Sequence, residues 1–191
     1  MNLPFDIYGL RDRLLPVEAN HPSGAALQDA AVAVIIDPKE QGGAILLIHR
    51  IEREGDRWSG QIAFPGGHRV SSDRNLLETA IRETAEEVGV FLLQHEMLGA
   101  LPLVMSRSGD VNVAPFVFQL KAGIEIQPNA EVADAFWLAL ADIVNSEIIQ
   151  SEVCTRGRRL VTDSYIYKGR VIWGLTFRII NLLIGRSVNP E

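Results

Sequence analysis

The chain carries four glutamates within ten residues: Glu78, Glu83, Glu86 and Glu87. Carboxylates at this spacing repel one another, and each like-charge pair on a helix costs about a few tenths of a kcal/mol. A divalent cation would offset the repulsion, and Mg²⁺ and Mn²⁺ prefer oxygen ligands. The glutamates therefore indicate a metal site. A solvated acidic helix surface is the alternative.

The residues around these glutamates predict an amphipathic helix over residues 77–88. Apolar or small positions recur every three or four residues, the period of one buried helical stripe: Leu77, Ala80, Ile81, Thr84, Ala85 and Val88. At about 100° per residue, Glu83, Glu86 and Glu87 fall within an arc of roughly 100°. The sequence therefore predicts three carboxylates on one helix face, opposite Ile81 and Val88.

Pro65, Gly66 and Gly67 come before this helix and predict a tight bend. Because glycine has no side chain, a backbone carbonyl at such a bend can approach a ligand closely. A carbonyl and carboxylates together form a hard-oxygen donor set. On the helix itself, Arg82 precedes Glu86 by four residues, so these two side chains can pair and steady the acidic array.

The segment "RETAEEVGV", residues 82–90, resembles the second half of the Nudix signature G-x5-E-x7-R-E-U-x-E-E-x-G-U, where U is aliphatic. Thr84 stands at the first aliphatic place. In the first half, five residues separate Gly67 from Asp73, which replaces the usual glutamate, and eight rather than seven then lead to Arg82. This aspartate and the added residue resemble the branch of the Nudix hydrolases that cleaves coenzyme A.

The resemblance extends over about residues 30–184. "LLIHR" and "GQIAFPGG" are similar to the upstream motif of the coenzyme A branch, and "IWGLTFRIINLLI" is similar to its C-terminal helix. One segment departs from the pattern. The branch carries a leucine-arginine-x-histidine segment before the Gly-Gln pair, whereas this chain reads "GDRWSGQ", and neither His49 nor His68 takes that place. This departure bears on the substrate and leaves the metal site unaffected.

The resemblance also implies roles for single residues. Glu83 and Glu87 are expected to ligate Mg²⁺ or Mn²⁺, together with the carbonyl of Gly67. Glu86 is expected to be a further ligand or the partner of Arg82, and both are counted among the catalytic residues. The bound ion neutralises phosphate charge and positions a water for in-line attack.

A proton acceptor and phosphate-binding groups complete the expected site. Glu131 is the candidate base, because "NAEVADAFWLAL" resembles the segment in which family members place an acidic residue; a surface-loop glutamate is the alternative. Arginines near the box can meet the substrate phosphates, and a solvated arginine is the alternative for each: Arg50, Arg53, Arg57 and Arg69. Gly66 and Gly67 are expected to contact the substrate as well.

Two aromatic residues near the glycine pair, Trp58 and Phe64, can stack on an adenine ring, and packing in the core is the alternative. Ser106 and Ser108 lie in a predicted turn, and no motif places a histidine near them. A serine hydrolase is therefore not supported.

These features predict hydrolysis of a diphosphate linkage in a small nucleotide-type substrate. By resemblance the substrate is coenzyme A or acyl-coenzyme A, cut into adenosine 3′,5′-bisphosphate and a phosphopantetheine portion. A Nudix diphosphatase acting on ADP-ribose, NADH or another nucleoside diphosphate derivative is the alternative. A non-catalytic nucleotide-binding sensor on the same fold is a second alternative, which predicts eroded glutamates.

Composition restricts the class of protein. The 191 residues are 47% apolar, which is enough for one sizeable core. A net charge of −6 without a basic stripe argues against nucleic-acid binding. Cys154 is the single cysteine, so no intramolecular disulfide forms and a reducing compartment is expected. The first residues do not read as a secretory signal, and the longest apolar run, residues 30–36, is too short to cross a membrane. We therefore expect a cytoplasmic protein without membrane contact.

The order of elements predicts an α/β fold, with an N-terminal helical leader over residues 1–24 and one domain over residues 25–191. Predicted strands cover residues 30–36 and 44–50 as a hairpin, then 97–105, 111–120, 135–140 and 165–174. The apolar C-terminal segment suits a buried helix or a homodimer contact. The resemblance sharpens the fold to a Nudix-type α/β/α sandwich with a mixed sheet and a loop-helix-loop catalytic box.

Overall fold

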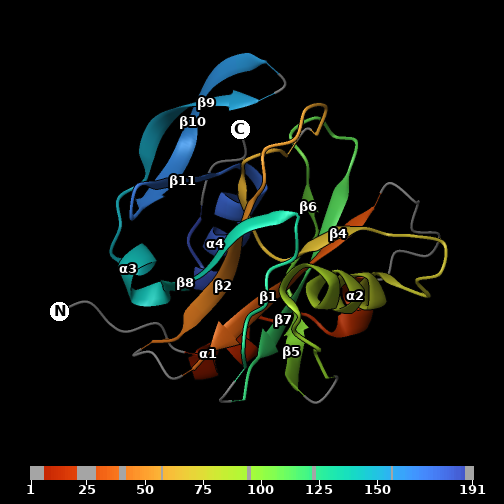
Figure 1. Ribbon diagram of the computed structural model, residues 1–191. Coiled ribbons are helices and arrows are strands. Elements are labelled where there is room, and N and C mark those ends of the chain that lie inside the picture. Colours follow the sequence, from red (N-terminus) through yellow and green to blue (C-terminus); the bar gives the residue numbers. More distant parts are fainter. Residues whose placement is uncertain are drawn as a thin grey trace.

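A computed structural model describes residues 7–20, 29–38, 42–56, 58–93, 96–121, 124–155 and 157–187 (Figure 1). Its helices are α1 (Ile7–Arg11), the 3₁₀ helix η1 (Val17–Asn20), α2 (Leu76–Val88), α3 (Leu140–Val144) and α4 (Gly174–Ile184). Its strands are β1 (Ala30–Asp37), β2 (Ala44–Arg50), β3 (Ile62–Ala63), β4 (Gly66–His68), β5 (Met97–Ala100), β6 (Val104–Met105), β7 (Asn112–Gln119), β8 (Val132–Ala139), β9 (Ile149–Thr155), β10 (Arg158–Tyr167) and β11 (Arg170–Trp173).

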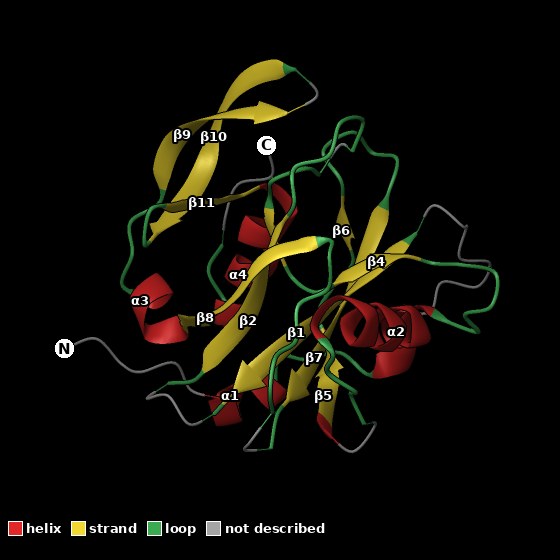
Figure 2. Ribbon diagram, in the orientation of Figure 1, coloured by secondary structure: helices red, strands yellow, loops and turns green. Residues whose placement is uncertain are grey.

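The described strands β1–β8 form one mixed sheet (Figure 2). Its main path runs β3-β2-β1-β7-β5, while β8 pairs with β2, β4 with β1 and β6 with β7. β1 and β7 are parallel, and the other pairs are antiparallel. The expected hairpin between β1 and β2 is present, with Ile36 opposite Ile45.

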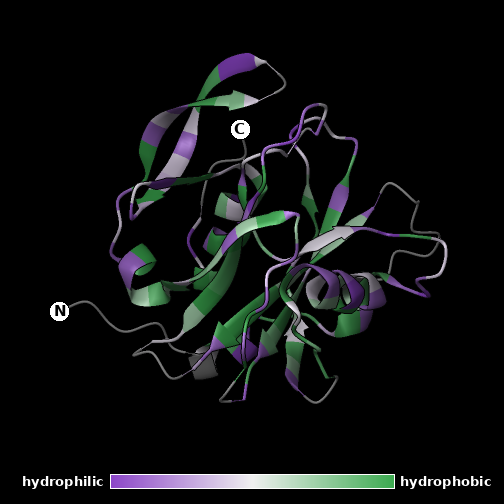
Figure 3. Cartoon of the chain, in the orientation of Figure 1, coloured by the Kyte–Doolittle hydropathy of each residue, from purple (hydrophilic) through white to green (hydrophobic). Residues whose placement is uncertain are grey.

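Each face of this sheet carries its own hydrophobic core. Successive side chains of a strand point to opposite faces. In β1, Val34 and Ile36 therefore pack with α1, α3 and α4, whereas Ala33 and Ile35 pack on the side of α2. The central strands are hydrophobic along much of their length (Figure 3), and their buried side chains divide between the two cores. Helices thus cover both faces, and the predicted α/β/α sandwich is confirmed.

A second, three-stranded antiparallel sheet, β11-β10-β9, stands at the upper left of Figure 1. The prediction of one strand over residues 165–174 was wrong in detail, because the chain reverses at Lys168 and Gly169 between β10 and β11. β9 was not predicted at all. Its burial pattern is mostly exposed, so the sequence lacks the apolar alternation that marks a strand.

Three other predicted boundaries need correction. Residues 97–105 form two short strands, β5 and β6, because each pairs with a different part of β7. The strand predicted over residues 135–140 ends at Ala139, and Leu140 begins α3. The C-terminal helix begins at Gly174, while Ile172 and Trp173 belong to β11. α4 is otherwise the buried helix that was expected, with Phe177 and Ile180 in the core.

The N-terminal region packs onto the sheet. Leu10 of α1 is fully buried in the core shared with α4. The backbone groups of Leu15 and Ala100 exchange two hydrogen bonds, of 2.8 and 3.0 Å. The predicted boundary between leader and domain, at residue 24, lies outside the described residues. Among the helices of the described residues, none has the length and apolar character that crossing a bilayer requires.

Candidate active site

The predicted catalytic helix is α2, and local signals set both of its ends. Its N-cap is Asn75, whose side chain accepts a hydrogen bond of 2.9 Å from the backbone N–H of Glu78. At the other end, Gly89 adopts the left-handed conformation and its N–H bonds to the carbonyl of Ala85. The helix therefore covers the box residues that the motif predicted.

The glycine bend lies where β1 changes partners. β1 pairs with β2 only near Ile36, and with β4 over Ala30, Ala31 and Val32. Between these two paired stretches of β1, the N–H of Ala33 donates a hydrogen bond of 2.8 Å to the carbonyl of Pro65. The glycine strand β4 is thus inserted beside the start of β1 and faces α2.

Close contacts surround both glycines, and at position 66 backbone atoms require glycine. A Cβ on Gly66 would lie 2.3 Å from the carbonyl oxygen of Ala31, and its φ of +153° is one that other residues rarely adopt. A Cβ on Gly67 would lie 2.6 to 2.7 Å from the carboxylate of Glu83. The glycine pair therefore lets the backbone of β4 lie directly against a carboxylate of the helix.

Glu87 is the most buried of the four glutamates of the catalytic box, with 3% of its side chain exposed. The N–H of Gly66 donates a hydrogen bond of 2.8 Å to Oε2 of Glu87, and Nη1 of Arg50 lies 3.3 Å from Oε1 of the same carboxylate. Burial raises the pKa of Glu87 to about 7, against the opposing effects of the Gly66 N–H and of Arg50. The charge of this carboxylate is therefore incompletely compensated by the groups around it.

Glu83 lies beside Glu87 and is also largely removed from water, with 18% of its side chain exposed. Burial is the main cause that raises the pKa of Glu83, and the hydrogen bond from Arg82 works in the opposite direction. Nη1 of Arg82 donates a hydrogen bond of 2.8 Å to Oε1 of Glu83. Glu83 and Glu87 are thus two carboxylates whose ionised forms are destabilised where they stand.

Arg82 joins the helix to the loop before it. Its Nε and Nη2 each donate a hydrogen bond of 3.0 Å to the carboxylate of Asp73. Nη2 also donates one of 3.1 Å to the carbonyl of His68. Thr79 donates 2.9 Å to the same carboxylate. The Arg82 hydrogen bonds hold the pKa of Asp73 down, at about 2. The predicted pairing of Arg82 with Glu86 is confirmed at 3.1 Å.

Helix geometry predicted that Glu83, Glu86 and Glu87 share one face of α2. In the structure the three side chains have different surroundings. Glu86 is 56% exposed and contacts Arg82, whereas Glu87 is buried and Glu83 lies against Gly67. The glutamate face of α2 lies at the boundary between solvent and the β4 backbone. A purely solvated acidic face is therefore excluded for Glu87.

The predicted arginines are used differently. Arg50 pairs with Asp56 at 3.0 Å as well as with Glu87. Arg69 donates 3.1 Å from Nη2 to the backbone carbonyl of Asp73 and so closes the loop between β4 and α2. Arg57 lies outside the described residues.

Glu131, the candidate base, pairs with Arg53 at 2.8 Å. Both side chains are about half exposed, at 45% and 52%. The N–H of Ile51 bonds to the carbonyl of Glu131, and the negative charge of Glu131 contributes to the raised pKa of Glu87. Glu131 therefore lies within electrostatic range of the buried glutamate.

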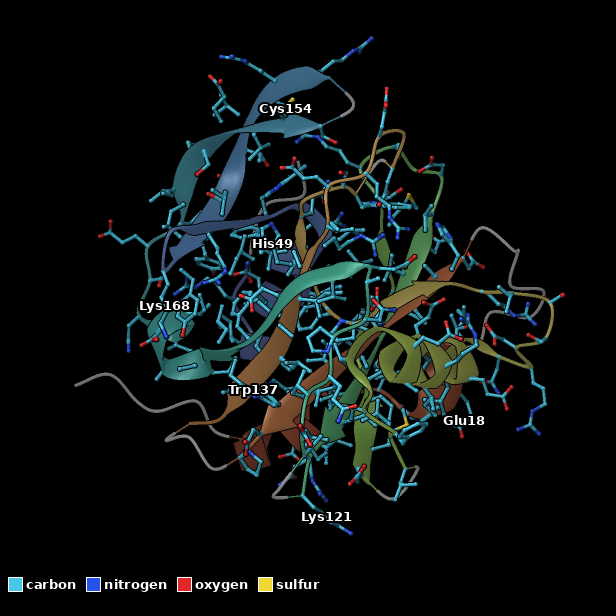
Figure 4. The ribbon with its side chains drawn as sticks, in the orientation of Figure 1. Glu18, His49, Lys121, Trp137, Cys154 and Lys168 are labelled. Atoms are coloured by element: carbon cyan, nitrogen blue, oxygen red, sulfur yellow. The ribbon has the colours of Figure 1, made fainter. Side chains whose placement is uncertain are left out.

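The remaining candidates separate clearly. Phe64 is 2% exposed and belongs to the core, so it is not a stacking surface. Trp58 is half-buried, and its ring centroid lies 5.3 Å from that of His68. Ser106 and Ser108 both donate to Asp110 within their turn. Cys154 is exposed on β9 (Figure 4).

No three acidic, histidine or cysteine side chains of the described residues converge closely enough here to hold an ion unaided. The donor set nevertheless fits a hard dication. Glu83 and Glu87 have raised pKa values, so a cation beside them would stabilise their ionised forms. Because Gly67 has no side chain, the Glu83 carboxylate lies directly against the backbone at this position. Glu83, Glu87 and the β4 backbone could therefore hold Mg²⁺ or Mn²⁺.

A NUDIX domain family model matches residues 26–153, which include β1, the glycine strand and α2. The chain belongs to the Nudix family. A protein of Photorhabdus laumondii named uncharacterized Nudix hydrolase NudL is 37% identical to it over 127 residues, which are 65% of this chain and 67% of that protein. This Nudix chain is accordingly an enzyme of the hydrolase family.

Solved structures share the fold. A MutT/nudix family protein from Enterococcus faecalis matches with a TM-score of 0.56 and 16% identity, over 85% of this chain and 62% of that chain. The NUDIX domain of Shewanella oneidensis NrtR, in complex with ADP ribose, matches with a TM-score of 0.51 and 22% identity, over 64% and 79% of the two chains. At these identities the likeness concerns the Nudix fold alone.

Two residues of the site were missed by reasoning from the sequence. Asp56 bonds to Arg50, and Thr79 bonds to Asp73. Thr79 lies six residues from Asp73, and it follows the Asn75 cap by one helical turn, which is a local signal that could have indicated the contact. Asp56 stands in an irregular loop, and no local pattern points to its partner.

Proposed function

We propose that this Nudix hydrolase cleaves the diphosphate linkage of coenzyme A or acyl-coenzyme A with the help of Mg²⁺ or Mn²⁺. The products would be adenosine 3′,5′-bisphosphate and a phosphopantetheine portion. The broader reaction is hydrolysis of a nucleoside diphosphate derivative, as befits the family. Enzymes of this family generally use divalent ions such as Mg²⁺ or Mn²⁺.

One observation carries the proposal: two desolvated carboxylates, Glu83 and Glu87, lie against the glycine strand that precedes their helix. Desolvation makes their charge costly unless a cation is present. Such a pair is poorly explained by fold stability alone, because a carboxylate whose pKa is raised by burial destabilises the folded state when it is ionised at neutral pH. A bound dication explains why the chain retains it.

Each residue then has a role. Glu83, Glu87 and the carbonyl of Gly67 would hold the ion, and Glu86 would either add a ligand or keep Arg82 in place. A bound ion would neutralise phosphate charge and lower the pKa of the attacking water. Glu131 would accept the proton of that water, because the carboxylates of Glu83 and Glu87 would be bound to the ion.

The basic groups and the loop complete the substrate site. Arg50, Arg57 and Arg69 meet the phosphates, with Gly66 and Gly67 allowing close approach of the backbone. Arg50 is supported best, because it already lies among the carboxylates.

The coenzyme A assignment rests on Asp73 and the added residue in the loop before α2. Asp73 is 5% exposed and fully engaged with Arg82 and Thr79. Asp73 is shorter than the usual glutamate, but the added residue lets it keep its hydrogen bonds to Arg82 and Thr79. This supports a functional variant of the signature rather than a degenerate one. This pattern resembles the coenzyme A branch.

ADP-ribose or NADH is the second candidate substrate class. The segment over residues 55–61 departs from the coenzyme A pattern, and it contributes the half-buried Trp58 beside His68. An aromatic surface of this kind suits any adenine nucleotide. The Shewanella oneidensis domain of the same fold was solved with ADP ribose.

A substrate panel tests the proposal. Purified protein is incubated with Mg²⁺ or Mn²⁺ and, separately, coenzyme A, acetyl-coenzyme A, ADP-ribose, NADH and nucleoside triphosphates, and products are identified by mass spectrometry. We expect kcat/KM for coenzyme A to exceed the others by more than about tenfold, or roughly 1.4 kcal/mol. A preference for ADP-ribose would replace the substrate assignment.

Glu87→Gln is the loss-of-function arm of this experiment, with Glu152→Gln as its control. Glu152 is an exposed carboxylate on β9 that pairs with Arg159. We expect Glu87→Gln to lose turnover and Glu152→Gln to keep it. A wild-type protein that binds these nucleotides but cleaves none of them would favour the non-catalytic sensor, although the intact glutamates argue against it. The homodimer and the cytoplasmic location stay predictions from the sequence.

A further inference from the structure

Arg50 stands where the β2–β8 ladder loses its register. Pairing is regular from Ala44 opposite Ala139 to His49 opposite Asp134, and then Arg50 lies opposite Val132 (Figure 4 labels His49). Ala133 is therefore left without a partner on β2, as in a β-bulge. Bulges commonly re-aim side chains beside active sites. Here the irregularity lies at the residue that contacts Glu87.

The guanidinium of Arg50 is shared unevenly between two carboxylates. Nη2 lies 3.0 Å from Asp56, whereas Nη1 lies 3.3 Å from Glu87. Among the described residues, Nε of Arg50 is the buried side-chain polar atom that has no hydrogen-bond partner. An arginine facing one carboxylate usually donates two parallel hydrogen bonds to it. Glu87 therefore receives only one long contact from a group able to give it two.

Asp56 is what holds the guanidinium in this position. Its other oxygen accepts a hydrogen bond of 2.9 Å from the N–H of Trp58, so the carboxylate is fixed to its own loop. Burial alone would raise the pKa of Asp56, but the bonds from Trp58 and Arg50 leave it below its ordinary value. Asp56 is thus charged and oriented, and it competes with Glu87 for Arg50.

We propose that Asp56 is a positioning residue for the metal site: it keeps Arg50 beside Glu87 rather than fully paired with it, so that a divalent ion neutralises Glu87. This inference rests on the proposed function, in which Glu87 is a metal ligand. Without the charge of Asp56, Arg50 can turn its fork fully onto Glu87. The ion would then have to displace a bidentate arginine before it could bind.

Mn²⁺ binding measured by isothermal titration calorimetry tests the inference without using turnover. For Asp56→Asn we expect a Kd about tenfold higher than that of the wild type, which corresponds to about 1.4 kcal/mol. Asp56→Glu keeps the charge and should recover most of the affinity. Asp134→Asn is the matched control, because Asp134 also pairs with an arginine, Arg170 at 2.6 Å, outside the proposed metal-ligand set. Its Kd should stay within twofold of the wild type.

A double-mutant cycle with Arg50→Gln separates positioning from other effects. If Asp56 acts through Arg50, then adding Asp56→Asn to Arg50→Gln should change the Kd by less than about twofold. A general field effect of the Asp56 charge, or a purely structural role through Trp58, would lower the affinity equally in both backgrounds. That result overturns the proposal. Circular dichroism and thermal unfolding establish that each variant is folded.

The two proposals fail in different ways. A wild-type protein that binds no Mn²⁺ would remove the proposed metal site and this inference together. A wild-type protein that binds Mn²⁺, with Asp56→Asn binding it equally well, would overturn the role of Asp56 and leave the proposed function intact.

Discussion

At the scale of single residues, neighbouring glutamates of one helix have different chemistry because they have different surroundings. Glu86 is exposed and Glu87 is buried, although they are adjacent in sequence. A raised pKa follows burial that is not matched by hydrogen bonds, as at Glu87. Asp73 shows the reverse, because its carboxylate accepts four hydrogen bonds, two from Arg82 and one each from Thr79 and Val70. The candidate metal ligands are the carboxylates that lack compensation.

Glu87 makes the stability of the metal-free protein depend on pH. Its pKa is about 7 in the folded chain, against 4.5 for an ordinary glutamate, so the folded state holds the proton more tightly. The free energy of unfolding should therefore fall as pH rises from about 4.5 through 7, by up to about 3 kcal/mol at roughly 1.4 kcal/mol per pH unit. Urea unfolding with a chelator at pH 5 and pH 8 measures this change.

Glu87→Gln should lack this loss and gain stability relative to the wild type at pH 8. Glu86→Gln is the control, since it removes the neighbouring exposed carboxylate. Equal pH dependence in the wild type and Glu87→Gln would contradict the assignment of the raised pKa to Glu87.

Glu131 is expected to act on rate rather than on metal binding. Glu131→Gln should lower kcat by about 10²- to 10⁴-fold, the usual contribution of a general base, with little change in Mn²⁺ affinity. Steady-state kinetics together with calorimetry measure both quantities. Arg53→Gln breaks the same ion pair but keeps the carboxylate. If both variants lose the same activity, the ion pair matters and Glu131 is not the base.

At the scale of elements, the loop and the helix of the catalytic box are one unit. Arg82 of α2 donates to Asp73 and to the carbonyl of His68, while Arg69 donates to the carbonyl of Asp73. These bonds fix β4, the loop and the helix relative to one another. The distance between the glycine pair and the glutamates is therefore set by residues that are not themselves candidate ligands.

Asp73→Asn should loosen this unit. Removing the charge leaves Arg82 partly buried without its main partner, which should cost about 2–4 kcal/mol at pH 7 in urea unfolding. Because the pKa of Asp73 is about 2, this contribution is present above about pH 4 and should disappear as pH falls towards 2. Glu152→Gln breaks an exposed pair and should cost less than about 0.5 kcal/mol. Equal losses in the two variants would show that the Asp73 bonds do not stabilise the fold.

At the scale of the whole molecule, residues beyond the matched NUDIX region complete the core. The family model ends at residue 153, yet Ile172, Phe177 and Ile180 belong to the same core cluster as Ile45 of β2. A buried polar link fastens this part to the remainder: Tyr165 donates 2.7 Å to Asn181, and Arg186 donates 2.9 Å to the Tyr165 hydroxyl. The C-terminal elements therefore stabilise the sheet from the face opposite α2.

Tyr165→Phe should destabilise the chain by about 1–3 kcal/mol, because the fully buried Asn181 loses its donor. Thermal unfolding measures the loss, and kcat of the folded protein should not change. In the control Tyr167→Phe, the lost hydrogen bond, to the carbonyl of Trp137, is only a 3.4 Å contact. It should cost less. A larger loss in the control would contradict the role of the Tyr165 link.

The sequence by itself determined what is local: the period of α2, its Asn75 and Gly89 ends, the buried run of β1, and the motif that assigns the family. Tertiary structure decided which carboxylates lose water, how Asp56 and Glu87 share Arg50, and where β9 pairs. Glu87 and Arg50 are 37 residues apart, and their contact depends on the order and register of the sheet. Side-chain periodicity specifies a face of one element, whereas burial and pKa depend on the neighbours that the fold brings to that face.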